Sequence, residues 1–288
     1  MYYNVAGHTL EILTGELGNI PSFSCFISEP VLSDPLVVIR LNEAVFDEDA
    51  TLLHQFTSEN VSYKFLGDGR LYFLRVQSPV AGASWLMKIY PEGKSFVALT
   101  DMNEDTDADI LRLAVWIAFG AAALHRKTVA IHSSTVTYNN KSILFLGESG
   151  TGKSTQSQLW LKYIPGTELL NDDSPFLSTD ENNNLTVYGS PWSGKTPCYK
   201  NKQTPVAAFI RLRQASYNAI RRLSTLEAIG AVQPSLPPVF AADPVLSDFM
   251  YECLSSMLRH TPAYILDCLP DESAAKLVYT TLKEDGWI

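Results

Sequence analysis

The chain has little cysteine, and the cysteines that it has are scattered. Cys25, Cys198, Cys253 and Cys268 lie far apart, and none forms a C-x-x-C pair. A zinc site built from paired cysteines is therefore not expected. A chain of 288 residues also buries enough core to be stable without disulfides. We interpret the thiols as reduced, which favours a cytoplasmic protein.

Long apolar runs and an excess of positive charge are missing as well. The longest apolar stretch, residues 110–124, contains Arg112 and is short for a bilayer span, so we interpret it as a buried helix. Residues 1–4 do not begin a basic region followed by an apolar stretch, so no signal peptide is expected. The net charge of −9 argues against a nonspecific nucleic-acid binder. We therefore expect neither a nucleic-acid partner nor a membrane.

The first hundred residues are rich in strand-type sequence. Six strands are expected, at residues 22–27, 36–41, 62–66, 71–76, 85–89 and 95–99. Gly67-Asp68-Gly69 is a hairpin turn signal between two of them. Residues 105–107 offer an N-cap for a helix that reaches about residue 125, so the domain boundary is placed just before them. The prediction is a β-rich region over residues 1–104, in which nothing suggests catalysis.

Residues 105–288 alternate strands and helices, which predicts an α/β domain. Strands are expected at residues 128–138, 141–146, 168–171, 185–188, 206–212 and 263–269. Helices are expected at residues 156–163, 225–232, 243–258 and 272–283. A turn at residues 138–141 joins the first two strands, which predicts a hairpin.

Residues 147–155 match the phosphate-binding loop pattern G-x-x-x-x-G-K-[ST] at every fixed position. Glycines let successive backbone N–H groups point at one anion. Lys153 can reach the outer phosphates, and the Ser154 hydroxyl can ligate a metal ion. An apolar strand before the loop and a helix after it provide the context that the motif needs. The residues expected to contact a nucleotide are Gly147, Ser149, Gly150, Thr151, Gly152, Lys153, Ser154 and Thr155.

Asp172 and Asp173 follow an expected strand downstream of the loop. A carboxylate at the end of a neighbouring strand often holds the metal in such enzymes. Adjacent side chains on an extended strand point to opposite sides, so a kink is expected to bring both carboxylates to the nucleotide. One would then hold Mg²⁺ and the other accept a proton. The alternative is an ordinary turn, because Asn-Asp-Asp-Ser-Pro is turn-prone; the upstream loop favours the site.

His132 lies in an apolar run and has two interpretations. A single histidine in such a strand is usually structural. If its strand pairs with residues 143–146, however, the imidazole approaches the loop. There it could act as a metal ligand, a phosphate donor or an acid/base group.

The ordered set of His132, the loop and Asp172-Asp173 resembles the catalytic core of HPr kinase/phosphorylase. The same order occurs in ATP-dependent phosphoenolpyruvate carboxykinase. Residues 262–274 resemble the tails of small HPr-kinase-related proteins, so the resemblance covers about residues 128–280. At one point the chain departs from HPr kinase, because residues 185–189 lack the glutamate that helps to hold metal there. The resemblance implies a P-loop domain with a mixed sheet, which follows the β-rich N-terminal region. It also implies ATP and Mg²⁺ as cofactors, and it implies oligomers.

The resemblance also implies roles for single residues. Lys153 would bind the β- and γ-phosphates, and Ser154 would bind Mg²⁺. Asp172 would be the base that activates the acceptor hydroxyl, and Asp173 would be a carboxylate near the metal. His132 would be an active-site histidine near the metal or the transferred phosphate.

Four further residues are candidates for the site, and each also has an ordinary structural interpretation. Arg211 or Arg213 could stabilise the charge of the transferring phosphate, or both could lie on a solvent-facing strand edge. Trp192 and Lys195 could shape an acceptor pocket, or they could belong to an ordinary glycine-containing loop.

The predicted function is ATP-dependent transfer of the γ-phosphoryl group to a hydroxyl of a protein, a peptide or a small molecule. Two alternatives remain open. A nucleotide-binding regulator with little catalysis would bind ATP without turnover. An enzyme similar to phosphoenolpyruvate carboxykinase would consume ATP in the presence of oxaloacetate.

Overall fold

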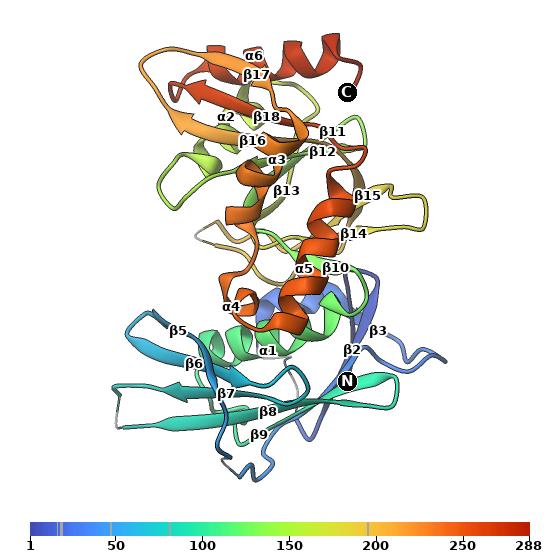
Figure 1. Cartoon of the computed structure of the whole chain (residues 1–288), viewed down its shortest axis with the longest axis vertical. Helices are drawn as coiled ribbons and strands as arrows, with labels where there is room; N and C mark the ends of the chain where they lie inside the picture. Colours follow the sequence, from blue (N-terminus) through green and yellow to red (C-terminus); the bar gives the residue numbers. More distant parts are fainter. Residues whose placement is uncertain (16, 18–19, 47, 81, 195) are drawn as a thin grey trace. The chain divides into compact units, whose positions relative to one another are not determined.

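The computed structural model describes residues 1–288 except 16, 18–19, 47, 81 and 195, and it divides the chain into two units (Figure 1). The first comprises Met1–Lys127 and Pro238–Met250, and the second comprises Thr128–Pro237 and Tyr251–Ile288. A boundary was expected before residue 105. The first unit instead continues to Lys127, because helix α1 (Ala108–Leu124) packs on its sheet. The return of residues 238–250 to this unit was not foreseen.

In the described part of the first unit, nine strands form a mixed sheet in the order β3-β1-β2-β4-β9-β8-β7-β6-β5. The β2–β4 and β4–β9 pairs are parallel, and the other pairs are antiparallel. The strands are β1 (Tyr2–Val5), β2 (His8–Leu13), β3 (Ile27–Ser28), β4 (Val37–Arg40), β5 (Leu52–Ser58), β6 (Val61–Gly67), β7 (Tyr72–Gln77), β8 (Ser84–Glu92) and β9 (Ser95–Thr100).

Five of the expected strands are confirmed as β4 and β6 to β9, but the strand expected at residues 22–27 is wrong. Pro21–Phe26 forms a 3₁₀ helix there, with the proline in its first turn, where its missing N–H costs nothing. The side chains of Phe23 and Phe26 are fully buried by this turn. The apolar run therefore serves the core without joining the sheet as a strand.

Helix α1 begins at a carboxylate cap and is buried along most of its length. Asp107 accepts hydrogen bonds from the backbone N–H groups of Asp109 and Ile110, as the acidic N-cap expected at residues 105–107 requires. The helix is the apolar stretch noted in the sequence. No helix in the described ranges is long and apolar enough to cross a membrane.

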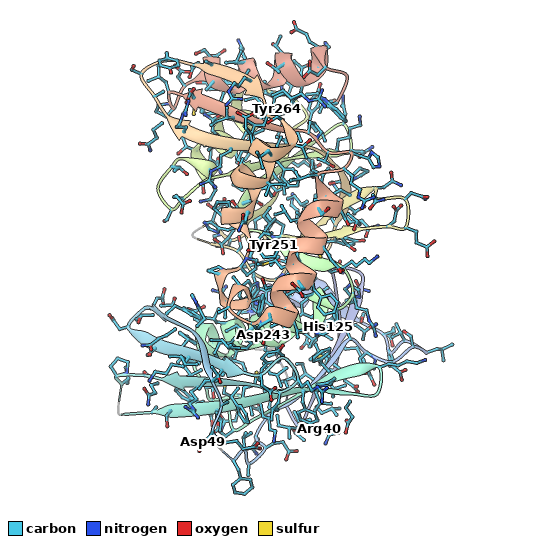
Figure 2. All side chains as sticks on the ribbon, viewed as in Figure 1. Arg40, Asp49, His125, Asp243, Tyr251 and Tyr264 are labelled. Atoms are coloured by element: carbon cyan, nitrogen blue, oxygen red, sulfur yellow. The ribbon has the colours of Figure 1, made fainter. Side chains whose placement is uncertain are left out.

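The returning segment is fixed to the first unit by one carboxylate. The Tyr72 hydroxyl donates to Asp243 Oδ1 at 3.0 Å, and the Leu246 backbone N–H donates to the same oxygen at 2.9 Å. Asp243 is labelled in Figure 2. The adjoining helices are α4 (Pro238–Ala241) and α5 (Pro244–Met257). Phe240 of α4 packs edge-on against Phe65, which adds an apolar contact to the polar one.

The partly buried imidazole of His8, in β2, makes the stability of the first unit dependent on pH. Burial, and secondarily the charge of Arg126, lowers the pKa of His8 from 6.5 to about 4. The unfolded chain therefore holds this proton more tightly, so stability is complete above about pH 6.5 and is lost as the pH falls toward about 4. We expect the step from pH 7 to pH 5 to cost about 1–2 kcal/mol through this residue.

The measurement is urea unfolding of the wild type and of His8→Gln at both pH values. Carboxylates contribute to the pH dependence of both proteins, so the informative quantity is the difference between them. The loss on acidification should be smaller in His8→Gln. Equal losses would show that His8 does not carry the effect.

The sheet of the second unit runs β10-β14-β15-β16-β12-β11-β13, with β18 paired to β16 and β17 to β18. Its strands are β10 (Thr128–Ala130), β11 (Ser133–Tyr138), β12 (Lys141–Leu146), β13 (Glu168–Asp173), β14 (Phe176–Thr179), β15 (Leu185–Tyr188), β16 (Gln203–Gln214), β17 (Ala219–Arg222) and β18 (Ala263–Cys268). Its helices include α2 (Lys153–Tyr163), α3 (Thr225–Val232) and α6 (Glu272–Glu284). Both sheets are mixed, so the chain has the α/β character that was expected.

One face of this sheet is covered by α2 and α6. The core between them contains Phe145, Ile210, Trp160 and Val278, all fully buried. Strand side chains alternate between faces, so Arg211, the neighbour of Ile210, lies on the opposite face. The layer of α2 and α6 therefore packs on the face of the sheet opposite to Arg211.

The hairpin of β11 and β12 sets the register of the site. Asn139 and Asn140 both have positive φ, 47° and 59°, as a two-residue hairpin turn of type I′ requires. This turn pairs Tyr138 with Lys141 and, at the far end, Ser133 with Leu146. The hairpin predicted from the sequence is therefore confirmed.

Candidate functional site

The glycine loop joins β12, which ends at Leu146, to α2, which begins at Lys153. Strand, loop and helix follow in the order that the sequence predicts. Gly152, directly before the helix, has φ of 104°, which a residue with a side chain rarely adopts. A Cβ at Gly147 would lie 2.3 Å from Thr151 Oγ1, so this glycine is required by close packing within the loop. Ser154 and Thr155 lie in the first turn of α2, where the positive end of the helix dipole favours an anion.

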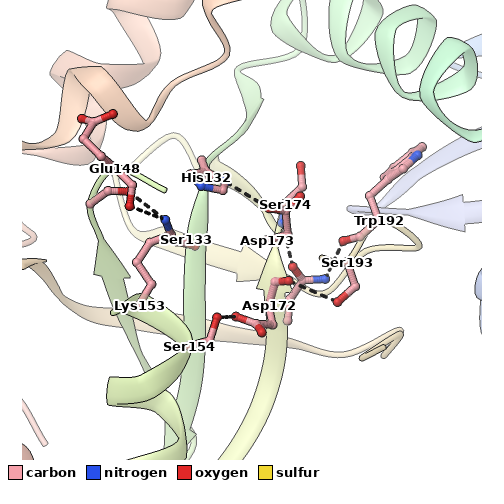
Figure 3. Close-up of polar contacts among 12 residues, drawn as sticks. His132, Ser133, Glu148, Lys153, Ser154, Asp172, Asp173, Ser174, Trp192 and Ser193 are labelled. Carbon is pink, nitrogen blue, oxygen red and sulfur yellow. Dashed lines mark hydrogen bonds and ion pairs between the residues drawn. The ribbon is translucent and has the colours of Figure 1, made fainter. Parts of the chain in front are cut away.

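The ammonium group of Lys153 folds back onto the loop. Nζ donates to the carbonyl oxygens of Gly147 at 2.8 Å and Glu148 at 3.2 Å (Figure 3). Burial lowers the pKa of Lys153, and the nearby carboxylates, that of Asp173 first, oppose this effect. The cation is thus held beside the loop by weak neutral acceptors, which a phosphate group can replace.

A single row of residues crosses four neighbouring strands at the start of the loop. Arg211 of β16 is opposite Leu146 of β12, Leu146 is opposite Ser133 of β11, and Ser133 is opposite Asp173 of β13. The loop begins one residue beyond Leu146. On one side of the loop strand β12 lies β16 with Arg211. On the other side, two strands away, lies β13 with Asp173.

Asp172 faces helix α2. Its Oδ1 accepts a hydrogen bond from the Ser154 hydroxyl at 3.0 Å (Figure 3). The side chain is buried, and its backbone carbonyl accepts from the Gly194 N–H at 2.7 Å and the Ser193 hydroxyl at 3.2 Å. This carboxylate is accordingly fixed beside the hydroxyl that the motif assigns to the metal.

Asp173 points the other way, to His132. His132 Nδ1 lies 3.1 Å from Asp173 Oδ1, and both side chains are nearly half exposed, at 47% and 41% (Figure 3). The strand expected over residues 128–138 is instead two strands, β10 and β11. His132 lies in the break between them, where its N–H donates to Ser235 O at 2.7 Å. The expected pairing with the loop strand is confirmed for β11, which begins one residue after His132.

The backbone at Asp173 departs from an ordinary strand, with a φ of 156°, but the two carboxylates still have different partners. Asp172 contacts Ser154, whereas Asp173 contacts His132. The resemblance assigned the base role to Asp172 and the metal role to Asp173.

Asn171, which the sequence analysis passed over, anchors the segment opposite the aspartates. Its side chain is fully buried, and Nδ2 donates to Trp192 O at 3.0 Å and to Ser190 Oγ at 3.3 Å. Its Oδ1 accepts from the Ser174 N–H at 2.9 Å. The only sequence signal was its position before the aspartates, and in isolation Asn-Asp-Asp is typical of a turn.

The remaining candidates lie in different surroundings. The Trp192 ring is buried and packs against Phe176, with 5.6 Å between ring centroids. Lys195 lies outside the described residues. Arg211 reaches the loop, where its Nη2 donates to Glu148 Oε1 at 2.7 Å. Arg213 pairs with Asp267 of β18 instead.

The described residues offer a metal ion a small, hard donor set. They contain no cluster of three or more histidine, cysteine or acidic side chains that could bind one alone. A hydroxyl from Ser154 and a carboxylate from Asp172 suit Mg²⁺, which keeps several waters and shares substrate phosphates. These donors fit Mg²⁺ that arrives with a nucleotide.

No family model matches the sequence, and the search of curated proteins finds no match. Among solved structures, the HPr(Ser) kinase/phosphatase from Coxiella burnetii is similar over 55% of this chain and 99% of its own, with 16% sequence identity and a TM-score of 0.33. That is a distant structural similarity, so a functional conclusion has to depend on the contacts of the site itself.

Proposed function

We propose that the second unit binds ATP with Mg²⁺ at residues 147–155 and transfers the γ-phosphoryl group to a hydroxyl. One observation carries the proposal. The Lys153 ammonium, the Ser154–Asp172 pair and the His132–Asp173 pair converge on the start of one helix. Each alone has an ordinary structural explanation, but together they supply the positioning and charge neutralisation that phosphoryl transfer needs.

Ser154 and Asp172 are the residues that would hold the metal. Their direct hydrogen bond places both oxygens within reach of one small cation. The chemistry that the metal would supply there is neutralisation of phosphate charge. Because Asp172 is buried and its backbone is tied to residues 193–194, it is suited to a fixed ligand role.

Asp173 and His132 are the residues that would handle the proton. Asp173 is partly exposed, so an acceptor hydroxyl can approach its carboxylate. As the hydroxyl oxygen bonds to the γ-phosphorus and the bond to the leaving ADP oxygen breaks, the hydroxyl proton would pass to Asp173. His132 would orient that carboxylate through its Nδ1 contact. This assignment reverses the roles that the resemblance implied for the two aspartates.

The proposal predicts that Lys153→Ala weakens ATP binding by roughly 10–100-fold, because charge-assisted contacts to phosphate are lost. Isothermal titration with ATP and Mg²⁺ measures this. Lys202→Ala is the matched control, since Lys202 pairs on the surface of the same unit with Glu168. A labelled-phosphate transfer screen in cell extract would then search for the acceptor.

The outcomes separate the alternatives. ATP binding without transfer to any acceptor would favour the nucleotide-binding regulator. A wild type that does not bind ATP, or a Lys153→Ala variant that binds it as well as the wild type, would overturn the proposal.

A further inference from the structure

An ion pair connects the second residue of the glycine loop to the neighbouring strand. Arg211 Nη2 donates to Glu148 Oε1 at 2.7 Å. The Arg211 side chain is 17% exposed, whereas that of Glu148 is 71% exposed. A second guanidinium nitrogen, Nη1, lies 3.4 Å from Ser235 Oγ. The arginine is therefore fixed by its surroundings, and the glutamate is the exposed partner.

The pair lies at the end of the loop where outer phosphates are expected. The Lys153 ammonium contacts the Glu148 carbonyl at 3.2 Å, and the lysine of this motif reaches the β- and γ-phosphates. Arg211 is opposite Leu146, the last strand residue before the loop. The charge of Arg211 also lowers the pKa of Lys153, as a cation close to that ammonium does.

Glu148 has an unfavourable position in a loop that is to hold a polyphosphate. Its carboxylate would lie close to groups of the same charge sign. Arg211, in contrast, presents a planar set of N–H donors that matches phosphate oxygens in pairs. The Glu148 side chain is largely exposed, so water can solvate its carboxylate when a phosphate replaces it on Arg211.

We infer that Arg211 and Glu148 form a charge-exchange pair that sets the preference of the loop for a nucleoside triphosphate over a diphosphate. This inference rests on the proposed function. Without nucleotide, the carboxylate of Glu148 is paired with the guanidinium of Arg211. When a γ-phosphate is present, Arg211 donates to the phosphate and the Glu148 side chain turns to solvent.

Arg213 offers a matched control on the same strand. It lies two residues from Arg211, so it is on the same face of β16, and it also pairs with a carboxylate. Its partner, Asp267, belongs to β18 rather than to the loop. A general effect of removing an arginine from this strand would appear in both variants.

The test measures ATP and ADP affinities with Mg²⁺ by isothermal titration for the wild type and for single variants. Arg211→Gln should weaken ATP binding roughly tenfold or more, with ADP binding changed far less. Glu148→Gln should tighten ATP binding several-fold, and this gain should shrink in the Arg211→Gln background because the two residues act as a pair. Arg213→Gln should leave both affinities as they are.

Each outcome decides between the inference and the proposal beneath it. Suppose that the wild type binds ATP and that Glu148→Gln and Arg211→Gln have the same ratio of ATP affinity to ADP affinity as the wild type. The charge exchange is then wrong, and the proposal that the loop binds ATP is kept. If the wild type binds neither nucleotide, both fall. Glu148 is largely exposed, so Glu148→Gln gives a decisive result even if Arg211→Gln unfolds, and Arg211→Lys tests the guanidinium while keeping the charge.

Discussion

Replacing Asp173 with asparagine is expected to lower kcat for phosphoryl transfer by roughly 10²–10⁴-fold, the range typical of a lost general base. Asparagine keeps the shape of the side chain and can still contact His132, which lies 3.1 Å from the carboxylate. It cannot accept the proton of the acceptor hydroxyl. ATP affinity should change only a few-fold, because Asp173 contacts the histidine rather than Ser154 or the loop.

Asp172→Asn is the matched comparison, one residue away on the same strand. Asp172 is hydrogen-bonded to Ser154, so its loss should raise the Mg²⁺ concentration needed for half-maximal activity, and saturating Mg²⁺ should restore much of the rate. Kinetics at several Mg²⁺ concentrations separate the two effects. If Asp172→Asn lost all transfer at saturating Mg²⁺ while Asp173→Asn kept it, the roles implied by the family resemblance would be correct.

The glycine loop and its flanks could be predicted because their signals are local. The loop pattern constrains a few adjacent residues, and the turn at Asn139-Asn140 specifies a hairpin by its own backbone preference. Expected strands and helices were placed correctly where the apolar period was regular, as in α3 and α5. The run at residues 22–27 failed because its proline and its buried phenylalanines suit a 3₁₀ turn equally well.

The arrangement of the site could not be predicted in the same way, because it depends on strand order. The local hairpin pairs β11 with β12, but nothing local places β13 on the other side of β11, and that pairing brings Asp173 to His132 at the loop. The direction of each aspartate follows from the same pairing. Whether Arg211 or Arg213 lies at the loop likewise depends on the neighbours of β16. Strand β18 is next to both residues, but only Arg211 is also paired with β12, which leads into the loop.

Asn171→Ala is expected to destabilise the second unit by about 2–4 kcal/mol, because it removes the buried hydrogen bonds that join this strand to Ser174, Ser190 and Trp192. The Asn171 side chain is fully buried and bonds to Ser190 and Trp192 through Nδ2 and to the Ser174 N–H through Oδ1. Urea unfolding measures the loss. Asn184→Ala is the control, since Asn184 also bonds through its amide but is exposed, and its replacement should cost under about 1 kcal/mol.

Asn171 should also influence catalysis, although it touches no reacting atom. The segment that it anchors holds the backbone of Asp172 through Ser193 and Gly194. Below its unfolding temperature, Asn171→Ala should therefore show a lower kcat and a higher Mg²⁺ requirement, with the affinity for ATP nearly unchanged. A variant that is less stable but keeps the wild-type kcat and Mg²⁺ dependence would limit Asn171 to a structural role. Asn171→Asp sharpens the test, because the carboxylate keeps the acceptor for Ser174 but cannot donate to the carbonyl of Trp192.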